Sequence, residues 1–142
     1  MALSESLIDI SLFTKTLLSK CCEKYSLTYQ QVVLINNIPI LDGIAISELS
    51  KKMGVDISTL SRNIKKMETK ELIMRKRCDK DTRSFKIYAT SNAEKINNDV
   101  ISEFDKTISK ILVNNNFSPS SSFIQNIDLI SWKLYKFLND EK

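Results

Sequence analysis

Hydroxyl-bearing and cationic side chains recur at helical spacing between residues 57 and 69. At about 100° per residue, one arc of a helix over this stretch presents Ser58, Thr59, Arg62, Lys65, Lys66 and Thr69. The arc holds no carboxylate, because Glu68 falls beside the opposite, apolar face. Arg can donate two hydrogen bonds to guanine, Ser and Thr can bond base edges or phosphates, and Lys can neutralise phosphates. We predict that this face contacts DNA; an ordinary solvated helix face is the alternative.

A second group of cations follows, on two strand-like runs at 72–77 and 84–90 and in the polar connection between them. Its members are Arg75, Lys76, Arg77, Lys80 and Arg83. A hairpin placed directly after a DNA-reading helix can reach the minor groove, where Arg is favoured by the negative potential of narrow A·T tracts. Asp79 and Asp81 lie in the same connection, so a charge-balanced solvent hairpin is the alternative.

The distribution of charge agrees with a polyanionic partner. The net charge is +4, but residues 51–86 hold 12 Lys/Arg and 5 Asp/Glu, a balance of +7, which leaves −3 for the rest. The chain has no histidine, which removes the commonest general base and the commonest metal ligand. We find no nucleophile paired with a base and no glycine-rich phosphate loop. The sequence therefore predicts no enzyme activity, no cofactor and no metal site.

The elements around the arc read as a helix-turn-helix. Ser47 is a candidate N-cap for a short helix over 48–53, and Gly54 fits its C-terminal cap. Asp56 then caps a longer helix to about residue 70, whose inward face should carry Ile57, Leu60, Ile64 and Met67. A short helix, a turn with Gly and a longer helix form the signature of this motif. The strand-like runs that follow make it a winged helix-turn-helix.

Amphipathic helices are predicted on both sides of this unit. Leu3 to about Glu23 is helix-like, and a second helix starts at the candidate N-cap Thr28 and ends before Pro39, ahead of a short strand-like stretch at 44–46. Two more apolar stripes, at 96–111 and 123–138, flank a polar break. Only two glycines and two prolines interrupt the chain. The predicted fold class is mainly α with a small β-hairpin wing, flanked by N- and C-terminal dimerisation helices.

Several short motifs, in order and at matching spacing, resemble the MarR family of transcription regulators. They are Leu27–Gln31, Ile46–Val55, Ser58–Ile64, Leu72–Arg75, Asp81–Ser84 and Ala89–Thr90. Two positions depart from the family pattern, since Glu71 and Ala93 stand where glycines are usual. A non-glycine residue at position 71 would resist a positive φ in the helix-to-strand turn.

The resemblance implies a single MarR-like domain over 1–142, with a DNA-binding region at 28–95 and dimerisation helices at 1–25 and 94–142. It implies a homodimer on a near-palindromic site in double-stranded DNA, with the recognition helix in the major groove and the wing in the minor groove. A transcription regulator, and more specifically a repressor, is the expected function. The expected DNA-binding residues are Ser58, Thr59, Ser61, Arg62, Lys65, Lys66, Arg75, Arg77, Lys80 and Arg83, with Arg83 in the minor groove and Asp81 steadying the wing. Many members lose DNA affinity when they bind a small phenolic or other ligand, a metal or an oxidant, so a small-molecule effector is a further candidate partner.

Cys21 and Cys22 offer a second sensing route, because some members of the family sense oxidants through a cysteine in the first helices. Nearby lysines could lower a thiol pKa. The alternative, which we favour, is that these free cysteines fill small gaps in the core. Metal sensing is disfavoured, since the cysteines lack metal-ligand spacing.

A winged-helix protein-interaction module is the competing function; such modules usually expose apolar or mixed surfaces. A cytoplasmic location is expected. No apolar run approaches the roughly 18 residues of a membrane span, and the N-terminus lacks the basic and apolar stretches of a secretory signal.

Overall fold

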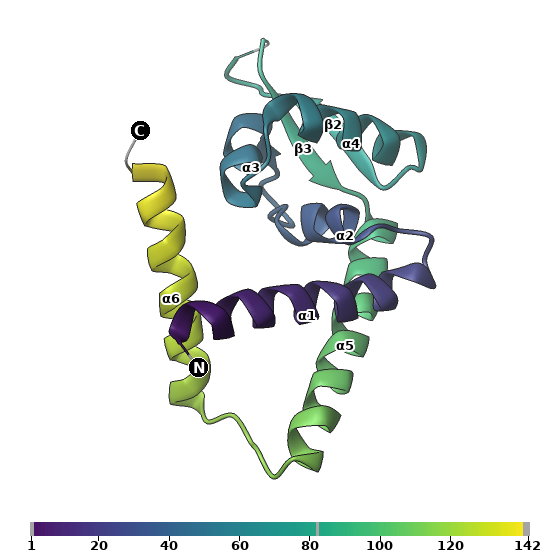
Figure 1. Ribbon diagram of the computed structural model, residues 1–142. Coiled ribbons are helices and arrows are strands. Elements are labelled where there is room, and N and C mark those ends of the chain that lie inside the picture. Colours follow the sequence, from purple (N-terminus) through teal and green to yellow (C-terminus); the bar gives the residue numbers. More distant parts are fainter. Residues whose placement is uncertain (1, 82, 141–142) are drawn as a thin grey trace. The chain divides into compact units, whose positions relative to one another are not determined.

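The computed structural model describes residues 2–81 and 83–140, which form helices and three short strands (Figure 1). In chain order the elements are α1 (Leu3–Glu23), α2 (Tyr29–Asn36), β1 (Ile44–Ala45), α3 (Ile46–Met53), α4 (Ile57–Thr69), β2 (Ile73–Arg77), β3 (Phe85–Ala89), α5 (Ser91–Asn114) and α6 (Ser121–Asp140). The chain forms two compact units, Met1–Asp105 and Lys106–Lys142. The predicted fold class, mainly helical with a small antiparallel sheet, is confirmed.

The sheet lies in the first unit and has the strand order β1-β3-β2, with both pairings antiparallel. In β2, Arg75 pairs with Ile87 and Arg77 with Phe85, while Ile44 of β1 pairs with Ile87 from the other side. Because paired residues project to the same face of a sheet, Arg75 and Arg77 share the face of the buried Ile87. Lys76 and Tyr88 project to the opposite face.

Most of the predicted helix starts agree with the structure. The Thr28 hydroxyl accepts the Gln31 N–H, and the Asp56 carboxylate accepts the Thr59 N–H, so both residues cap their helices as predicted. The prediction for Ser47 is wrong, since α3 begins at Ile46 with Ala45 as N-cap and no side-chain capping bond. Ala45 pairs with Lys86 in the sheet, so strand pairing fixes the start of this helix in place of a capping hydroxyl.

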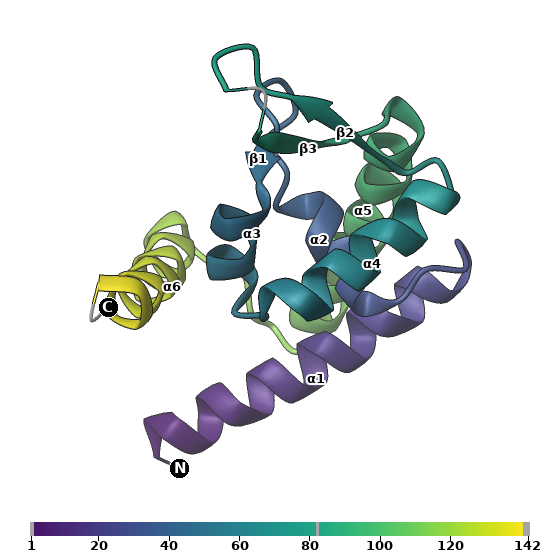
Figure 2. The same ribbon diagram turned by 90° about the horizontal axis from the view of Figure 1, so that it is seen from above.

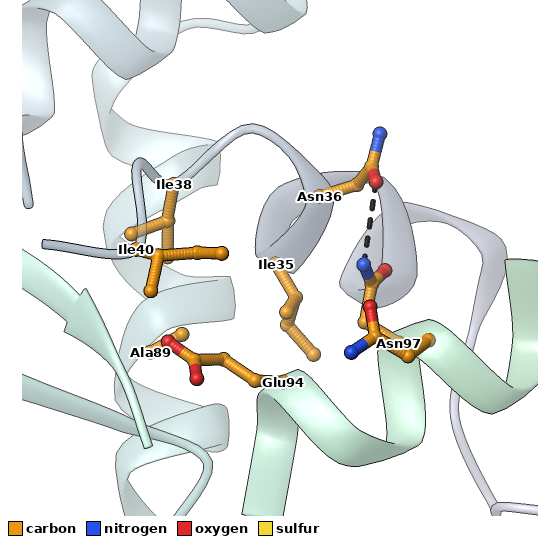
Figure 3. A pocket seen from close by; sticks show the side chains of 8 residues that line it. Ile35, Asn36, Ile38, Ile40, Ala89, Glu94 and Asn97 are labelled. Atoms are coloured by element: carbon orange, nitrogen blue, oxygen red, sulfur yellow. Dashed lines mark hydrogen bonds between the residues drawn. The ribbon is translucent and has the colours of Figure 1, made fainter. Parts of the chain in front are cut away.

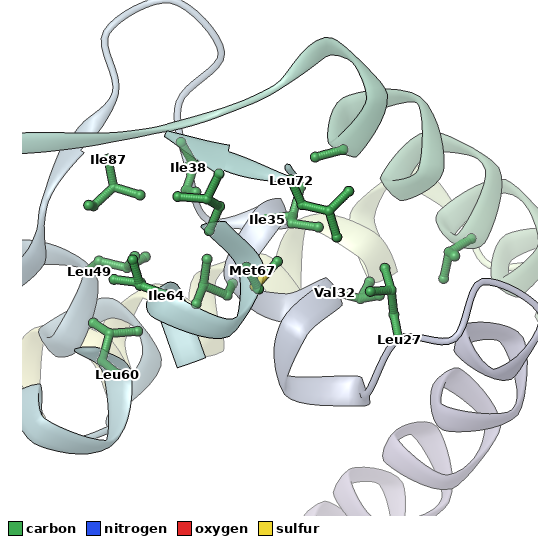
Figure 4. Close-up of a cluster of buried hydrophobic side chains, with 14 of the residues drawn as sticks. Leu27, Val32, Ile35, Ile38, Leu49, Leu60, Ile64, Met67, Leu72 and Ile87 are labelled. Atoms are coloured by element: carbon green, nitrogen blue, oxygen red, sulfur yellow. The ribbon is translucent and has the colours of Figure 1, made fainter. Parts of the chain in front are cut away.

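One core joins α2, α3, α4 and the sheet. Figure 4 shows Leu60, Ile64 and Met67 of α4 facing Leu49 of α3 and Ile87 of β3. Each of these five side chains is fully buried. The spacing of three and four residues along α4 explains why one face is covered and the other is left to solvent. Two views show α4 beside α3, with the sheet along one edge of the helical layer (Figures 1 and 2).

The connection from α4 to β2 follows a helix-ending motif that usually contains glycine. Glu71 has φ 57, its N–H donates to the carbonyl of Glu68, and the Leu72 N–H donates to the carbonyl of Met67. These two bonds define a Schellman motif, in which the left-handed position favours glycine. Glu71 therefore adopts the positive φ that a non-glycine residue resists, and its backbone is strained there.

Large apolar side chains are exposed on α1 and on α6. On α1 they are Leu3, Leu7, Ile8, Ile10, Leu12 and Phe13, and on α6 they include Phe123, Ile127, Ile130, Trp132, Leu134 and Leu138. No described residue of α6 is buried. Among the residues that the structure describes, no helix is both long enough and apolar enough to cross a bilayer.

Candidate nucleic-acid interface

Gly54 sets the turn between α3 and α4. It has φ 62, and the neighbouring Val55 N–H donates to the carbonyl of Ser50 at 3.2 Å. A Cβ added at Gly54 would meet no atom within 4 Å, so this position needs glycine for its backbone conformation alone. The predicted glycine cap is present, and it fixes the direction in which α4 leaves α3.

Asp56 organises the first turn of α4. Its carboxylate accepts the Thr59 N–H at 2.9 Å and the Thr59 hydroxyl at 2.7 Å, and it also accepts the Ser58 hydroxyl. The Ser58 and Thr59 hydroxyls, followed by the Thr59 N–H, hold the pKa of Asp56 well below its usual value. The carboxylate is therefore charged at neutral pH and orients both hydroxyls that the sequence assigned to DNA.

The predicted DNA-facing arc of α4 is on the surface. Arg62, Lys65 and Lys66 are exposed, together with Ser58, whereas Thr59 and Ser61 are half-buried. The guanidinium of Arg62 donates from Nη2 to the Thr59 hydroxyl at 3.4 Å. Asp56, Thr59 and Arg62 thus form a hydrogen-bonded row at the start of this face, which orients the Arg62 side chain.

The first residue of α4 does not lie where the sequence placed it. Ile57 is 52% exposed, although its spacing from Leu60 and Ile64 predicted an inward position. The 3.6-residue period fixes direction around the helix, but burial also needs a neighbouring element, and the described residues leave this turn uncovered. Ile57 adds an apolar group to the exposed first turn, of the kind that can contact a thymine methyl.

Arg75 forms an ion pair within the protein. Its Nε lies 2.9 Å from Oε1 of Glu68, so this ion pair ties β2 to α4. Their side chains are 36% and 30% exposed. Among the ion pairs of the described residues, Arg75 is the predicted DNA contact whose charge has a carboxylate partner.

The remaining wing cations are arranged differently. Arg77 lies over the ring of Phe85 at 5.5 Å from its centroid, a cation–π contact between directly paired residues. Lys80 and Arg83 are exposed, and among the described residues neither forms an ion pair. Their side-chain charges are therefore accessible to a phosphate or a groove.

Asp81 shapes the tip of the wing. Its carboxylate accepts the Arg83 N–H at 3.0 Å, and its carbonyl accepts both the N–H and the hydroxyl of Ser84 at 3.1 Å. These bonds support the wing-steadying role that the resemblance implies. Thr82, within the same motif, lies outside the described residues.

A contact that the sequence did not predict supports β3 of the wing. A Cβ on Gly43 would lie 2.7 Å from the ring of Tyr88, so the ring packs directly on the backbone of this glycine. On the same ring lies Nζ of Lys76, 4.8 Å from the centroid. The Lys86 ammonium also donates to the carbonyl of Asp42 at 3.2 Å. The 42–43 turn therefore holds β3, and through Tyr88 it restrains Lys76 of β2.

Also missed was a link between α2 and α4. Nδ2 of Asn63 donates to Oε1 of Gln30 at 3.3 Å. Both residues flank the predicted surface, and their amides have the donor and acceptor pairs that read adenine. Their only signal in the sequence was the position of Asn63 next to Arg62.

Cys21 and Cys22 lie within the core. Their residues are 4% and 0% exposed, and burial raises the pKa of both thiols. Burial raises the pKa of Cys21 most, and the nearby Glu103 raises it further. Lys24 lowers the pKa of Cys21 by a smaller amount. The expected lysine effect is present but outweighed, which favours the structural role over oxidant sensing. No cluster of three potential metal ligands occurs in the described part of the chain.

A separate pocket of about 220 Å³ lies between the end of α2, the loop that follows it, the end of β3 and the start of α5 (Figure 3). Its lining residues are Ile35, Asn36, Ile38, Ile40, Ala89, Glu94, Asn97 and Asn98. The pocket shares no residue with the exposed face of α4.

Comparison with known proteins finds a family and individual relatives that are similar to this chain. Residues 27–85 match the MarR family. The HTH-type transcriptional regulator MgrA of Staphylococcus aureus is 29% identical over 91 residues, which cover 64% of this chain and 62% of MgrA. The match therefore spans less than two thirds of that relative.

Solved structures share the fold at low sequence identity. AbsC, a MarR family transcriptional regulator from Streptomyces coelicolor, superposes with a TM-score of 0.75 at 17% identity, over 96% of this chain and 91% of AbsC. The S. aureus MepR–DNA complex gives a TM-score of 0.69 at 20% identity, over 94% of this chain and 96% of MepR.

Proposed function

We propose that the chain, whose residues 27–85 match the MarR family, is a member of this family and a sequence-specific DNA-binding transcription regulator. One observation carries the proposal. The second helix of the helix-turn-helix, α4, presents Arg62, Lys65 and Lys66 on its exposed face, and the Asp56 carboxylate at its N-cap already accepts hydrogen bonds from Ser58 and Thr59. MepR, which shares the fold, has been solved with DNA.

We propose that α4 is the recognition helix and enters the major groove, while the wing reaches the adjacent minor groove. Arg62 and the oriented hydroxyls of Ser58 and Thr59 would read base edges, with Lys65 and Lys66 on phosphates. Arg83 would enter the minor groove from a tip shaped by Asp81. The DNA-binding region is 28–95, and repression is the proposed mode of regulation.

We further propose that the regulator is a homodimer joined through 1–25 and 94–142. The exposed leucine, isoleucine and phenylalanine side chains of α1 and α6 support this, because such apolar patches are usually covered by a partner. A two-fold pair would place its recognition helices about 34 Å apart, one turn of DNA, and would favour a near-palindromic site. Sedimentation equilibrium at micromolar concentration should give a dimer. A monomer, with and without DNA, would contradict the proposed homodimer.

Selection of duplex fragments by the purified protein, followed by binding at increasing salt, tests the function. The logarithm of the association constant should fall against the logarithm of salt with a slope of about −0.9 per phosphate neutralised. Enrichment of one near-palindromic sequence together with this slope is the expected result. Failure to enrich any sequence, with binding that does not respond to salt, would favour a protein-interaction module.

A further inference from the structure

We propose that the pocket formed by α2, β3 and α5 is a binding site for a small organic cation, a protonated amine carried on an apolar body. Figure 3 shows the carboxylate of Glu94 beneath Ile40, the amides of Asn36 and Asn97 at the other end, and Ile35 between them. The site is thus acidic at one end, amide-rich at the other and apolar between.

The charge of the residues that line the pocket indicates the class of ligand. Glu94 is the one lining residue with a charged side chain, and no lysine or arginine lines the pocket. Within the described residues no cation forms an ion pair with Glu94. Because Glu94 is half-buried, its carboxylate is partly removed from water and its interaction with a bound ammonium is less screened. A bound carboxylate would instead bring a second negative charge beside it.

The amides point to a hydrogen-bond donor. Nδ2 of Asn97 donates to Oδ1 of Asn36 at 3.3 Å, while Oδ1 of Asn97 is buried and has no hydrogen-bond partner in the described structure. Buried acceptors are nearly always paired in folded proteins, so this oxygen marks a hydrogen-bonding deficit next to the pocket. An N–H of a bound ligand can supply the missing donor.

The apolar wall fits a small hydrocarbon body. Ile35 and Ile38 are buried, whereas Ile40 is 71% exposed beside the opening. A ligand that covers Ile40 removes this apolar surface from water, which is favourable. The volume of about 220 Å³ is below the ~300–1,000 Å³ of sites for drug-sized molecules, so the ligand is smaller than these.

The pocket borders the joint between the wing and α4. Ala89 lines it, and the next residue, Thr90, donates from its N–H to the carbonyl of Leu72 and from its hydroxyl to the carbonyl of Glu71, both at 3.0 Å. A ligand there would lie where it can act on the wing, a consequence that rests on the function proposed above. The ligand site itself rests on the pocket alone.

Nuclear magnetic resonance on the full chain tests the site without DNA. Benzylamine and benzoate have the same ring and opposite charge, and each is titrated while the side-chain amides of Asn36 and Asn97 and the backbone amides of Ala89 and Glu94 are followed. Benzylamine should shift these signals saturably, and benzoate should not. Equal shifts with both probes, or shifts confined to other parts of the chain, would overturn the proposal.

Two variants and one control sharpen the result. Glu94→Gln should weaken benzylamine binding about tenfold, as expected for loss of a hydrogen bond to a charged group. Ile40→Ala keeps the charge and should weaken binding several-fold through lost apolar contact. Asp99→Asn, on the same helix but outside the pocket, should bind as the parent does. Unchanged benzylamine affinity in both pocket variants would contradict the assignment, whatever the outcome of DNA binding.

Discussion

Glu68 Oε1 of α4 lies 2.9 Å from Arg75 Nε of β2, so one ion pair joins the proposed recognition helix to the first strand of the wing. Both side chains are about one-third exposed, and such pairs contribute only about 0–1 kcal/mol to stability. The importance of this contact is therefore geometric and electrostatic. It places a carboxylate next to the cationic surface and occupies an arginine that could otherwise reach a phosphate.

Glu68→Gln should therefore tighten binding to non-specific duplex DNA. The substitution removes one negative charge and releases Arg75, so affinity should rise several-fold at low salt and the salt slope should steepen by up to about 0.9. Fluorescence anisotropy at several salt concentrations measures both quantities. Glu23→Gln, at the exposed end of α1, makes the same charge change away from the cationic surface of α4 and the wing, and serves as the control. Weaker binding by Glu68→Gln alone would mean that the ion pair positions the wing productively.

Glu71→Gly should stabilise the protein. Position 71 has φ 57, and a non-glycine residue in this region costs roughly 1–2 kcal/mol, part of which is offset by the larger backbone entropy of glycine when unfolded. We expect a net gain of about 0.5–1 kcal/mol in the free energy of unfolding, measured by urea denaturation. Glu71→Ala removes the carboxylate but keeps the strain, and should show no such gain. Equal effects of the two substitutions would assign the change to the carboxylate.

Gly43 and Gly54 need glycine for different reasons: Gly43 for steric contact as well as backbone conformation, and Gly54 for backbone conformation alone. Their φ values are 61 and 62, but a Cβ at Gly43 would meet the Tyr88 ring at 2.7 Å while one at Gly54 would meet nothing within 4 Å. Gly54→Ala should cost roughly 1 kcal/mol through backbone strain. Gly43→Ala should cost about 1–3 kcal/mol more, because both the Tyr88 ring and the Ile87 carbonyl, 2.8 Å from the added Cβ, must move. Urea denaturation of both variants provides the comparison, and equal losses would show that Tyr88 and the Ile87 carbonyl yield without cost.

Local patterns were enough to predict most of the elements. The turn residues Gly54 and Asp56 and the buried positions Leu60, Ile64 and Met67 all follow from spacing and capping rules that act within one helix. The failures at Ser47 and Ile57 have a common cause. Sheet pairing at Ala45 and the lack of a covering element at Ile57 are tertiary effects that no local pattern contains.

The contacts that organise the candidate site were less predictable. The Glu68–Arg75 pair and the packing of Tyr88 on Gly43 join residues from different elements, and their register is known only once the sheet is formed. Residue type alone identified the exposed cations of α4. It could not show that Arg75 is already paired, or that Asp56 orients the hydroxyls of Ser58 and Thr59.

In the proposed complex, α4 reads bases while the wing reads groove shape. Arg62 is exposed in the middle of α4, where its side chain can reach a base edge, and Arg83 is exposed at the tip of the hairpin. Loss of a bidentate base contact should cost ~1–3 kcal/mol per contact and relax preference at one position of each half-site. Loss of a minor-groove arginine should instead weaken binding most where the flanks are A·T-rich.

The most direct measurement compares Arg62→Ala and Arg83→Ala on a panel of selected sites altered either at the half-site bases or in the flanks. Both variants should remain folded, because both side chains are on the surface. Arg62→Ala should lose discrimination among the half-site variants and keep its response to the flanks, while Arg83→Ala should show the reverse, with Asp81→Ala resembling it in part. Equal loss of affinity across the whole panel would contradict the account, since both arginines would then act only as phosphate contacts.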